Sequence, residues 1–457
     1  MPADLGPVGG SPAASRRPAR PLAAPADTTH RTPLLHPRGN SRRDLAVLGL
    51  GHLGLPLAQA AVTAGIATVG HDPVRAQDLA AGRVPGDGDD AALTAADVRR
   101  MLAGGFRPTT DPAELGRVRT AVICAPTPPG ADGTPSLSPV IEATSTLAAH
   151  LRPHTTVIIE SPVPPGTTET LLLPLLEEGS GLRAGRDFHL AHAPGRLDPG
   201  NRTQPYAAIP KVIGGYTPAC TESAATFYSR LTDKVVRARG PREAETVHLL
   251  ETNYRHVNIA LVNEMAVLCH DLNVDLWDVI RCAETKPFGF QAFRPGPGVG
   301  GHALPQDLTS RHFPTRPLRM VELARQVNDT MPGYVVQRAA ALLNEHGKSA
   351  RGARVLLLGI TYKPDLADQQ GAPAQEIATR LMHLGAAVSY HDPYVPSWNV
   401  LDRPVPRADS LYEAAADADL TILLQHHRTY DLQGLAVKAQ LLLDTRGATP
   451  AGAAHRL

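Results

Sequence analysis

The chain has 457 residues, more than a single hydrophobic core usually supports, so two or three domains are expected. Its 45 basic residues nearly balance 44 acidic ones, which leaves a formal net charge of +1, and aromatic residues make up 4% of the chain. This composition gives no field that attracts nucleic acid or an anionic membrane, and few rings on which bases could stack. We therefore expect a soluble, cytoplasmic protein that binds a small molecule, with no nucleic-acid partner and no membrane partner.

The cysteines indicate the redox compartment and bear on metal binding. Cys124, Cys220, Cys269 and Cys282 form no C-x-x-C pair, and all four stand in apolar or helix-like surroundings. This spacing indicates a reducing compartment and no structural zinc or other metal site. We predict that Cys269 and Cys282 are packed core residues.

Residues 1–43 are rich in Pro, Ala and Arg and show no apolar periodicity, so we predict a disordered tail. Two arginines, Arg42 and Arg43, then precede a stretch without Asp, Glu, Lys or Arg from Leu45 to Gly70, which could be read as a twin-arginine signal or a membrane span. Regularly placed glycines favour a strand–turn–helix instead.

That stretch carries a dinucleotide fingerprint in its required setting. A buried-strand run ends at Leu48, and the sequence Gly49-Leu-Gly51-His-Leu-Gly54 leads into a helix. Gly49 permits the tight turn, Gly51 lets the backbone approach a pyrophosphate, and Gly54 allows close helix–strand contact. The helix N-terminus then supplies amide donors and a positive dipole to phosphate.

An acid follows at the expected distance. Asp72 stands about 20 residues beyond the fingerprint, where a carboxylate binds the ribose diol and repels a 2′-phosphate. NAD is therefore favoured over NADP, with Arg75 beside the adenine or ribose. The alternative is a Rossmann domain that keeps its fold glycines and binds nothing.

Further strands, at 120–124, 156–160 and 188–192, each end in a loop rich in Pro or Gly, as at the ligand-binding edge of a parallel sheet. Helical periodicity then runs over 241–285 without a proline from Arg242 to Lys286, which predicts one long helix or two in series. Such a helix bridges domains or packs against a symmetry mate, so a homodimer is expected. A second α/β unit begins at Arg354.

The predicted fold class is therefore α/β, with two Rossmann-like parallel-sheet domains joined by a long central helix. We place the boundaries as follows: a tail at 1–43, an NAD-binding Rossmann domain at 44–235, a central helical dimerisation region with a glycine loop at 236–335, and a Rossmann-like domain that binds a nucleotide sugar at 336–457.

From about residue 44 onward the chain resembles the UDP-glucose/GDP-mannose dehydrogenase family. Besides the fingerprint, the shared motifs are Pro126-Thr-Pro128, Val163-Pro-Pro-Gly-Thr-Thr168, Asn258-Ile-Ala-Leu-Val-Asn-Glu264, Lys286-Pro-Phe-Gly-Phe290, Pro295-Gly-Pro-Gly-Val-Gly-Gly-His302, Asn328-Asp-Thr-Met-Pro332 and Tyr362-Lys-Pro364. The Lys-Pro-Phe-Gly-Phe stretch is most similar to bacterial members, which include enzymes that act on N-acetylated UDP-hexosamines.

The resemblance implies a four-electron oxidation of C6 of a nucleotide sugar with two NAD. In the family a cysteine thiolate captures the intermediate aldehyde, and a lysine and an asparagine one helical turn apart stabilise oxyanions. A glutamate in a Pro-Glu-Arg motif and an aspartate manage water and protons.

This chain departs from that set at five positions. The cysteine position holds Ala303, the lysine position His248, the asparagine position Thr252 and the glutamate position Gly195, while Gln370 replaces an arginine expected to bind diphosphate. The nucleophile of the family is therefore missing.

Other family positions remain. The candidate catalytic residues are His248, a possible acid or base near neutral pH, together with Asp307 and Thr127. The alternative for His248 is a polar residue on a helix face. The candidate substrate-binding residues implied by the resemblance are Lys286, Phe290, Gly300, Gly301 and Lys363.

Three functions follow from this pattern. The first is a repurposed enzyme that binds NAD and catalyses a two-electron, isomerising or non-redox reaction, such as a cyclisation, in bacterial specialised metabolism. The second is a non-catalytic partner of an active paralogue. The third is a genuine UDP-sugar 6-dehydrogenase of polysaccharide biosynthesis, with unusual residues.

Overall fold

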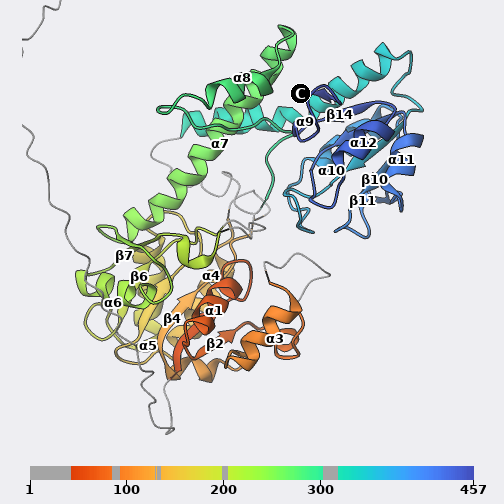
Figure 1. The fold of residues 1–457 in the computed structure, drawn as a ribbon. Helices are drawn as coiled ribbons and strands as arrows, with labels where there is room; N and C mark the ends of the chain where they lie inside the picture. Colours follow the sequence, from red (N-terminus) through yellow and green to blue (C-terminus); the bar gives the residue numbers. More distant parts are fainter. Residues whose placement is uncertain (1–42, 85–92, 129, 131–134, 198–203, 302–317) are drawn as a thin grey trace, which may run out of the picture. The chain divides into compact units, whose positions relative to one another are not determined.

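The computed structural model describes residues 43–84, 93–128, 130, 135–197, 204–301 and 318–457, all within the unit Arg42–Leu457. The tail expected at 1–43 therefore lies outside the described residues except for Arg43. The described chain confirms the predicted fold class: it contains a large, mainly parallel sheet, a second parallel sheet and a helix of 31 residues (Figure 1).

The first sheet has eight strands in the order β3-β2-β1-β4-β5-β6-β7-β8, and all neighbours are parallel except β6 and β7. The order 3-2-1-4-5-6 is that of a dinucleotide-binding Rossmann sheet, whose ligands bind where the strand order reverses, here beside β1 and β4. The strands are β1 (Arg43–Leu48), β2 (Thr68–His71), β3 (Arg107–Thr109), β4 (Val118–Ile123), β5 (Thr156–Ile159), β6 (His189–His192), β7 (Lys211–Gly215) and β8 (Val235–Arg237).

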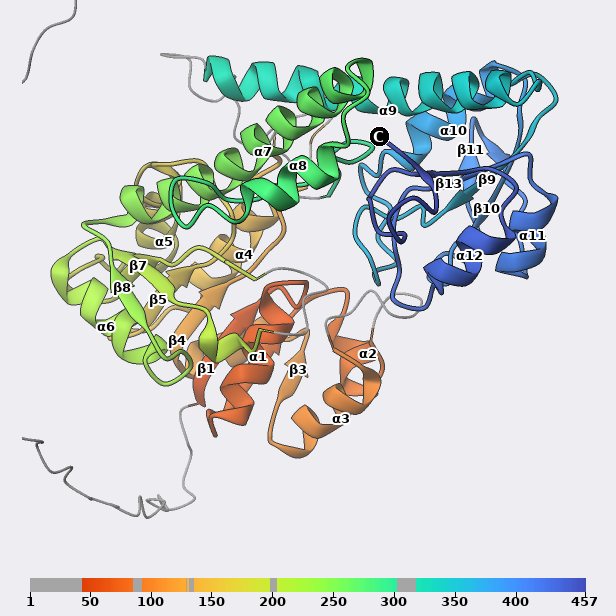
Figure 2. The same ribbon diagram turned by 45° about the horizontal axis from the view of Figure 1, so that its top comes forward.

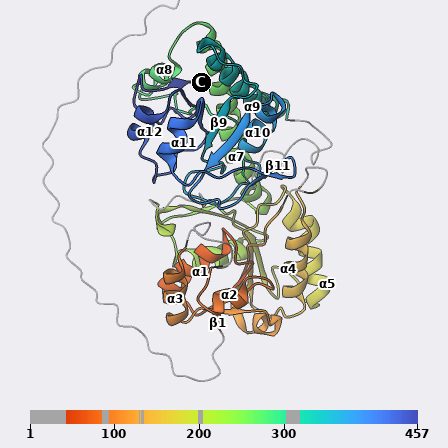
Figure 3. The same cartoon turned by 90° about the vertical axis from the view of Figure 1, so that its right-hand side faces the viewer.

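Both faces of this sheet are covered because alternate residues of each strand point to opposite sides. On β1, Leu45 and Val47 pack with α1, α3 and α6, whereas Ala46 and Leu48 pack with α4 and α5 (Figure 3). The helical segments are α1 (Gly54–Thr63), α2 (Ala76–Ala80), α3 (Ala95–Ala103), η1 (Pro112–Arg117), α4 (Ser138–Ala148), η2 (Thr168–Leu172), α5 (Leu173–Ser180), η3 (Tyr206–Ala208) and α6 (Pro218–Tyr228).

The second sheet repeats this plan with five parallel strands in the order β10-β9-β13-β14-β15. Val355 and Leu357 of β9 pack towards α9 and α10, and Leu356 and Leu358 pack towards α11 and α12. The elements are β9 (Arg354–Leu358), α10 (Ala374–His383), β10 (Ala387–His391), the antiparallel pair β11 (Asn399–Val400) and β12 (Arg403–Pro404), α11 (Leu411–Asp417), β13 (Leu420–Leu423), α12 (Leu432–Lys438), β14 (Leu442–Asp444) and β15 (His455–Arg456).

Three helices form the central region. The segment predicted as one helix or two in series is two helices, α7 (Pro241–Asp271) and α8 (Leu276–Ala283). Helix α7 packs on β6 and β7 near its start and against α9 (Arg319–Glu345) along the rest of its length (Figure 2). Helix α9 was not predicted from the sequence, and it contains a proline, Pro332, in its interior. The proposed boundary at 335/336 falls within this helix.

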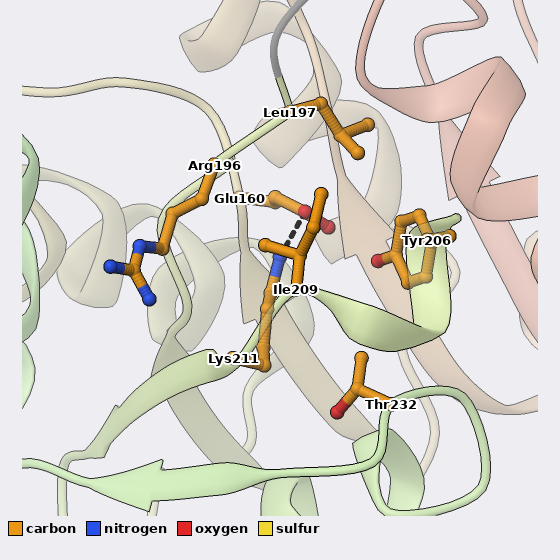
Figure 4. A pocket seen from close by; sticks show the side chains of 7 residues that line it. All are labelled: Glu160, Arg196, Leu197, Tyr206, Ile209, Lys211 and Thr232. Carbon is orange, nitrogen blue, oxygen red and sulfur yellow. Dashed lines mark hydrogen bonds and ion pairs between the residues drawn. The ribbon is translucent and has the colours of Figure 1, made fainter. Parts of the chain in front are cut away.

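A buried ion pair lies in the first domain. The Lys211 ammonium at the start of β7 contacts the carboxylate of Glu160 (Figure 4). The Tyr228 hydroxyl donates to the same carboxylate at 2.9 Å. The Lys211 side chain is 5% exposed and that of Glu160 1% exposed, so removing either partner would leave an uncompensated charge. The neighbouring cavity of about 10 Å³ holds at most one water, and the Tyr206 hydroxyl that lines it has no partner among the residues that the structure describes.

We predict that Glu160→Gln lowers the free energy of unfolding by about 3–5 kcal/mol, because the Lys211 ammonium then loses its counter-charge in a dry site. Urea unfolding followed by circular dichroism measures the change. The control is Glu160→Gln combined with Lys211→Met, which removes both charges and should lose less stability than the single variant. A loss below about 1 kcal/mol in the single variant would contradict this reading of the pair.

Candidate functional site

Different physical constraints explain why glycine occupies each position of the fingerprint. Gly49 has a φ of +91°, and a Cβ there would lie 2.9 Å from the Cys124 carbonyl oxygen, while a Cβ on Gly54 would lie 1.9 Å from the Gly49 oxygen. These two glycines are therefore required by the fold itself. A Cβ on Gly51 would meet no atom within 4 Å. The fold does not require that glycine, and the open space fits the close approach of a dinucleotide pyrophosphate.

Asp72 fixes the fingerprint loop to the end of β2. Its Oδ2 accepts the Leu50 amide at 2.9 Å, and its Oδ1 accepts the amides of Val74 and Arg75, each at 2.9 Å. A carboxylate offers about four lone-pair sites, so this half-buried group keeps capacity for a ribose hydroxyl. The residues predicted to hold NAD thus lie together at the switch point of the sheet.

The second domain contains the same glycine turn and aspartate, but there the aspartate is covered by another side chain. Gly359 has a φ of +70°, its Cβ would lie 2.3 Å from the Gln425 oxygen, and the next amide, that of Ile360, donates to Asp392 Oδ2 at 2.8 Å. Asp392 is fully buried, however, and its Oδ2 also accepts a hydrogen bond from Nε2 of His427 at 3.0 Å. Because the Asp365 amide donates to Nδ1 of His427 at 2.9 Å, the proton resides on Nε2. The imidazole covers the acid that a ribose would need.

Helix α7 presents a polar buried face to the loops at the carboxyl edge of the first sheet. Glu245 is 1% exposed and accepts the amides of Gly166 and Thr168, the latter at 2.8 Å. Burial raises the pKa of the Glu245 carboxyl, while these amide donors oppose the shift. Sequence reasoning missed Glu245, although an acid one turn before His248 in a helix expected to be buried was a usable signal.

His248 follows Glu245 on the next turn and is half-buried. Burial lowers the pKa of its imidazole, with Glu251 acting to raise it and Arg255 to lower it. His192 is buried at the end of β6, and its Nδ1 lies 3.5 Å from the Thr168 hydroxyl. Burial, and to a smaller extent the neighbouring His248 and Lys211, lower the pKa of His192 to about 3. Both imidazoles are therefore neutral at neutral pH, and a neutral imidazole can accept a proton.

Three polar atoms further along α7 lack partners among the residues that the structure describes. They are Oγ1 of Thr252, Oδ1 of Asn253 and Nε2 of His256, and each side chain is at least nine-tenths buried. The Asn328 amide nitrogen lies 3.4 Å from Nδ1 of His256 and 3.4 Å from the His256 carbonyl oxygen, on the side of the ring away from Nε2. Buried polar groups of this kind are usually satisfied by water or by a bound polar molecule.

Gly195 lies against the fingerprint loop. A Cβ there would lie 2.7 Å from Cδ2 and 2.9 Å from Cδ1 of Leu53, so the Leu53 side chain occupies the space that any side chain at 195 would enter. The next residue, Arg196, binds Glu251 of α7 through two nitrogens and the Pro210 carbonyl through a third. The space next to Gly195 is thus filled by a side chain from a neighbouring loop.

The glycine loop packs against the chain itself. A Cβ on Gly300 would lie 2.6 Å from the Gly371 oxygen, and one on Gly301 would lie 2.7 Å from the Tyr362 ring. The Gly301 amide also donates to the Gln370 carbonyl at 3.0 Å. Packing within the chain therefore explains why glycine occupies these two positions. Substrate binding by Gly300 and Gly301 stays a prediction. Lys363 lies in the same 362–373 segment, after β9.

The remaining predicted residues are dispersed. Thr127 is half-buried in the loop after β4, whereas Lys286 and Phe290 lie on an exposed segment in which the Lys286 ammonium is over the Phe288 ring. Ala303 and Asp307 lie outside the described residues. The expectation for the cysteines holds for Cys269 and is wrong for Cys282, which is exposed on the solvent-facing side of the short helix α8.

The described residues contain neither a metal-binding cluster nor a membrane-spanning helix. In the described ranges no three His, Cys, Asp or Glu side chains are grouped so that they could hold a metal ion. No helix in the part of the chain that the structure describes is long and apolar enough to cross a membrane.

Comparison with known proteins agrees with this architecture. Residues 43–232 match the NAD-binding domain of the UDP-glucose/GDP-mannose dehydrogenase family, residues 242–330 its central domain and residues 356–451 its UDP-binding domain. The chain is 31% identical over 414 residues to a UDP-N-acetyl-D-mannosamine dehydrogenase of Pyrococcus horikoshii, covering 88% of this chain and 95% of the relative. It is 32% identical over 359 residues to a UDP-N-acetyl-D-glucosamine 6-dehydrogenase of Pseudomonas aeruginosa, covering 77% and 83%.

Solved structures show the same fold. A UDP-D-ManNAc dehydrogenase structure from Pyrococcus horikoshii superposes with a TM-score of 0.79 at 29% identity, covering 90% of this chain and 97% of the other. A UDP-glucose dehydrogenase from Pyrobaculum islandicum gives a TM-score of 0.78 at 25% identity, covering 92% and 98%. The chain belongs to the UDP-glucose/GDP-mannose dehydrogenase family. It carries the NAD-binding domain of a family whose dehydrogenases use NAD, and a UDP-binding domain that indicates a nucleotide-sugar ligand.

We predict that Asp72→Ala weakens NADH binding by about 10-fold or more, because the variant loses a charged acceptor for ribose and the anchor of the fingerprint loop. Titration of NADH fluorescence measures the affinity. The matched control is Asp392→Ala, which removes the corresponding closed acid of the second domain and should leave NADH affinity unchanged. Equal NADH affinity in the Asp72 variant and the unchanged chain would show that this acid does not bind cofactor.

A second prediction concerns Gly195. Gly195→Ala should lower the free energy of unfolding by about 1–3 kcal/mol through overpacking against Leu53. Combined with Leu53→Ala, the same change should cost much less, and a double-mutant cycle measures the coupling by urea unfolding. If the two effects simply add, the two side chains do not share this space.

Proposed function

We propose that this chain binds NAD and a nucleotide sugar but does not carry out the four-electron C6 oxidation typical of its family. The observation that carries the proposal is the set Ala303, His248, Thr252 and Gly195 at the four positions where the family has its cysteine, lysine, asparagine and glutamate. An alanine methyl group cannot form the thiohemiacetal through which an aldehyde becomes an acid. The close packing of Gly195 against Leu53 supports an adaptation of the loop to the missing carboxylate.

The remaining groups fit a repurposed enzyme. His248 and Asp307 are the candidate acid–base pair, with Thr127 nearby in the family pattern. A neutral His248 imidazole could take the proton of a sugar hydroxyl while NAD accepts the hydride, which gives one aldehyde or ketone and one NADH per sugar. An isomerisation or a cyclisation, in which the hydride is returned or never moves, fits the same residues.

The substrate class follows from the relatives. Proteins named as UDP-N-acetyl-D-mannosamine and UDP-N-acetyl-D-glucosamine dehydrogenases match the chain over most of their length. We propose a UDP-N-acetylhexosamine or a sugar derived from one, with Lys286, Phe290, Gly300, Gly301 and Lys363 as its candidate contacts.

A homodimer is part of the proposal, because α7 exposes an apolar stripe. Leu250 is 69%, Leu261 55% and Leu268 49% exposed on the helix, and Leu272, which follows its last residue, is 63% exposed. Exposed apolar stripes of this length mark interfaces. A helix stripe can cover the same stripe of a second copy across a two-fold axis.

The same stripe favours a second candidate function, that of a non-catalytic partner which pairs through α7 with an active paralogue. The intact fingerprint and Asp72 favour the third, a genuine UDP-sugar 6-dehydrogenase with unusual residues. Losing several groups that each contribute about 10²–10⁴-fold argues against that third function.

We predict that the chain with NAD forms no uronic acid from UDP-N-acetylmannosamine, UDP-N-acetylglucosamine or UDP-glucose. NADH absorbance together with mass spectrometry of the sugar is the measurement. Ala303→Cys alone should not restore acid formation, because the other four positions, His248, Thr252, Gly195 and Gln370, remain changed. Two NADH and one uronic acid per sugar over many turnovers would refute the proposal, whereas one NADH with a carbonyl product would support the two-electron reaction. Activity seen only after mixing with a second family member would favour the partner function.

We predict that light scattering gives at least twice the monomer mass of 48.4 kDa. Leu261→Glu combined with Leu268→Glu should give the monomer mass, because two charges would be buried in the stripe. Val437→Glu on α12, at a position that is 80% exposed, is the matched control and should keep the larger mass. A monomer mass for the unchanged chain at tens of micromolar would exclude the dimer.

A further inference from the structure

The loop that holds Gly195 is tied to α7 by an ion pair beside His248. Nε of Arg196 donates to Oε2 of Glu251 at 3.3 Å, and Nη2 donates to Oε1, so the guanidinium binds the carboxylate with two parallel bonds. Nη1 donates to the Pro210 carbonyl at 2.8 Å, which fixes the guanidinium from a third side. Two-pronged pairs of this kind hold both geometry and charge in place.

Glu251 is also a helical neighbour of His248. Residues three apart on an α-helix lie on the same side, so the carboxylate that receives Arg196 flanks the imidazole. The side chains of Arg196 and Glu251 are 26% and 38% exposed, so water screens this pair only in part. The Glu251 carboxylate therefore interacts with both the Arg196 guanidinium and the His248 imidazole. Its charge stabilises a protonated His248 less when Arg196 is bound to it.

We propose that Glu251 is a positioning residue that tunes the protonation of His248, and that Arg196 limits this effect by holding the same carboxylate. This inference rests on the proposed acid–base role of His248 for its functional meaning, although its physical content does not require turnover. Neither Glu251 nor Arg196 is assigned a direct part in the reaction.

The other charged groups around His248 act from known places. Arg255 lies two turns further along α7 and lowers the pKa of the imidazole, and burial lowers it most. Glu245 is engaged with the amides of Gly166 and Thr168. His192, at the end of β6, has a pKa of about 3 and stays neutral, so it adds no charge in the range where His248 titrates.

The proposal makes two substitutions move one quantity in opposite directions. Glu251→Gln removes the negative charge and should lower the pKa of His248. Arg196→Gln removes the competing cation and frees the carboxylate, so it should raise the pKa of His248. A merely structural role would loosen the loop in both variants, expose the imidazole and raise the pKa in both, because burial is the largest cause that lowers it.

The experiment is deuterium exchange at the imidazole Cε1 carbon, followed across pH by mass spectrometry of the peptide that contains His248. This measurement reports one histidine among 19 and uses the full chain without substrate. Glu251→Asp keeps the charge and should stay closer to the unchanged chain than Glu251→Gln does. Arg255→Gln is the second cation control and should raise the pKa without touching the Arg196 pair.

Opposite shifts in the Glu251→Gln and Arg196→Gln variants support the proposal, and shifts in the same direction or no shift in either overturn it. If the Arg196 variant does not fold, as judged by circular dichroism, the comparison of Glu251→Gln with Glu251→Asp and Arg255→Gln decides in its place. The acid–base role is tested separately, by the turnover of a His248→Gln variant. If that variant keeps full turnover while the pKa of His248 shifts as expected in the other variants, the acid–base role is refuted and the effect of Glu251 on His248 still stands.

Discussion

The candidate site depends on the buried carboxylate of Glu245 on α7. The buried face of this helix is mixed: it carries Glu245 and other polar side chains beside apolar ones such as Leu249 and Ala260, while several leucines are exposed. The buried carboxylate is tolerable because the amides of Gly166 and Thr168 satisfy it. That contact fixes the first turns of α7 against the first sheet. His248, one turn further on, is thereby held at the loops where ligands of such a sheet bind.

The two Rossmann-like domains use one turn for different ends. In both, a glycine with positive φ follows the first strand, and the next amide binds an aspartate at the end of the neighbouring strand. Asp72 remains half-exposed, so it keeps the capacity to bind a ribose, whereas His427 covers Asp392 completely. The same local geometry thus supports cofactor binding in one domain and is purely internal in the other. The difference lies in one side chain, that of His427, which comes from the loop after β13.

The loop of Gly195 is packed closely, whereas the neighbouring face of α7 stays polar. Leu53 fills the space next to Gly195, and Arg196 ties the loop to α7 through Glu251. Further along α7, polar atoms of Thr252, Asn253 and His256 are buried and lack partners among the described residues. Buried polar atoms of this kind are usually satisfied by water or by a bound polar molecule.

The sequence by itself determined the fold class, the dinucleotide turn, the acid at 72 and the family, because these depend on local periodicity and on glycines whose backbone conformation few residues can adopt. Tertiary structure alone decided that Glu245 is the anchor of α7, that Gly300 and Gly301 pack on the chain itself, that Cys282 is exposed and that His427 closes the second acid. These facts depend on contacts between segments far apart in the chain, and no spacing within one segment encodes them.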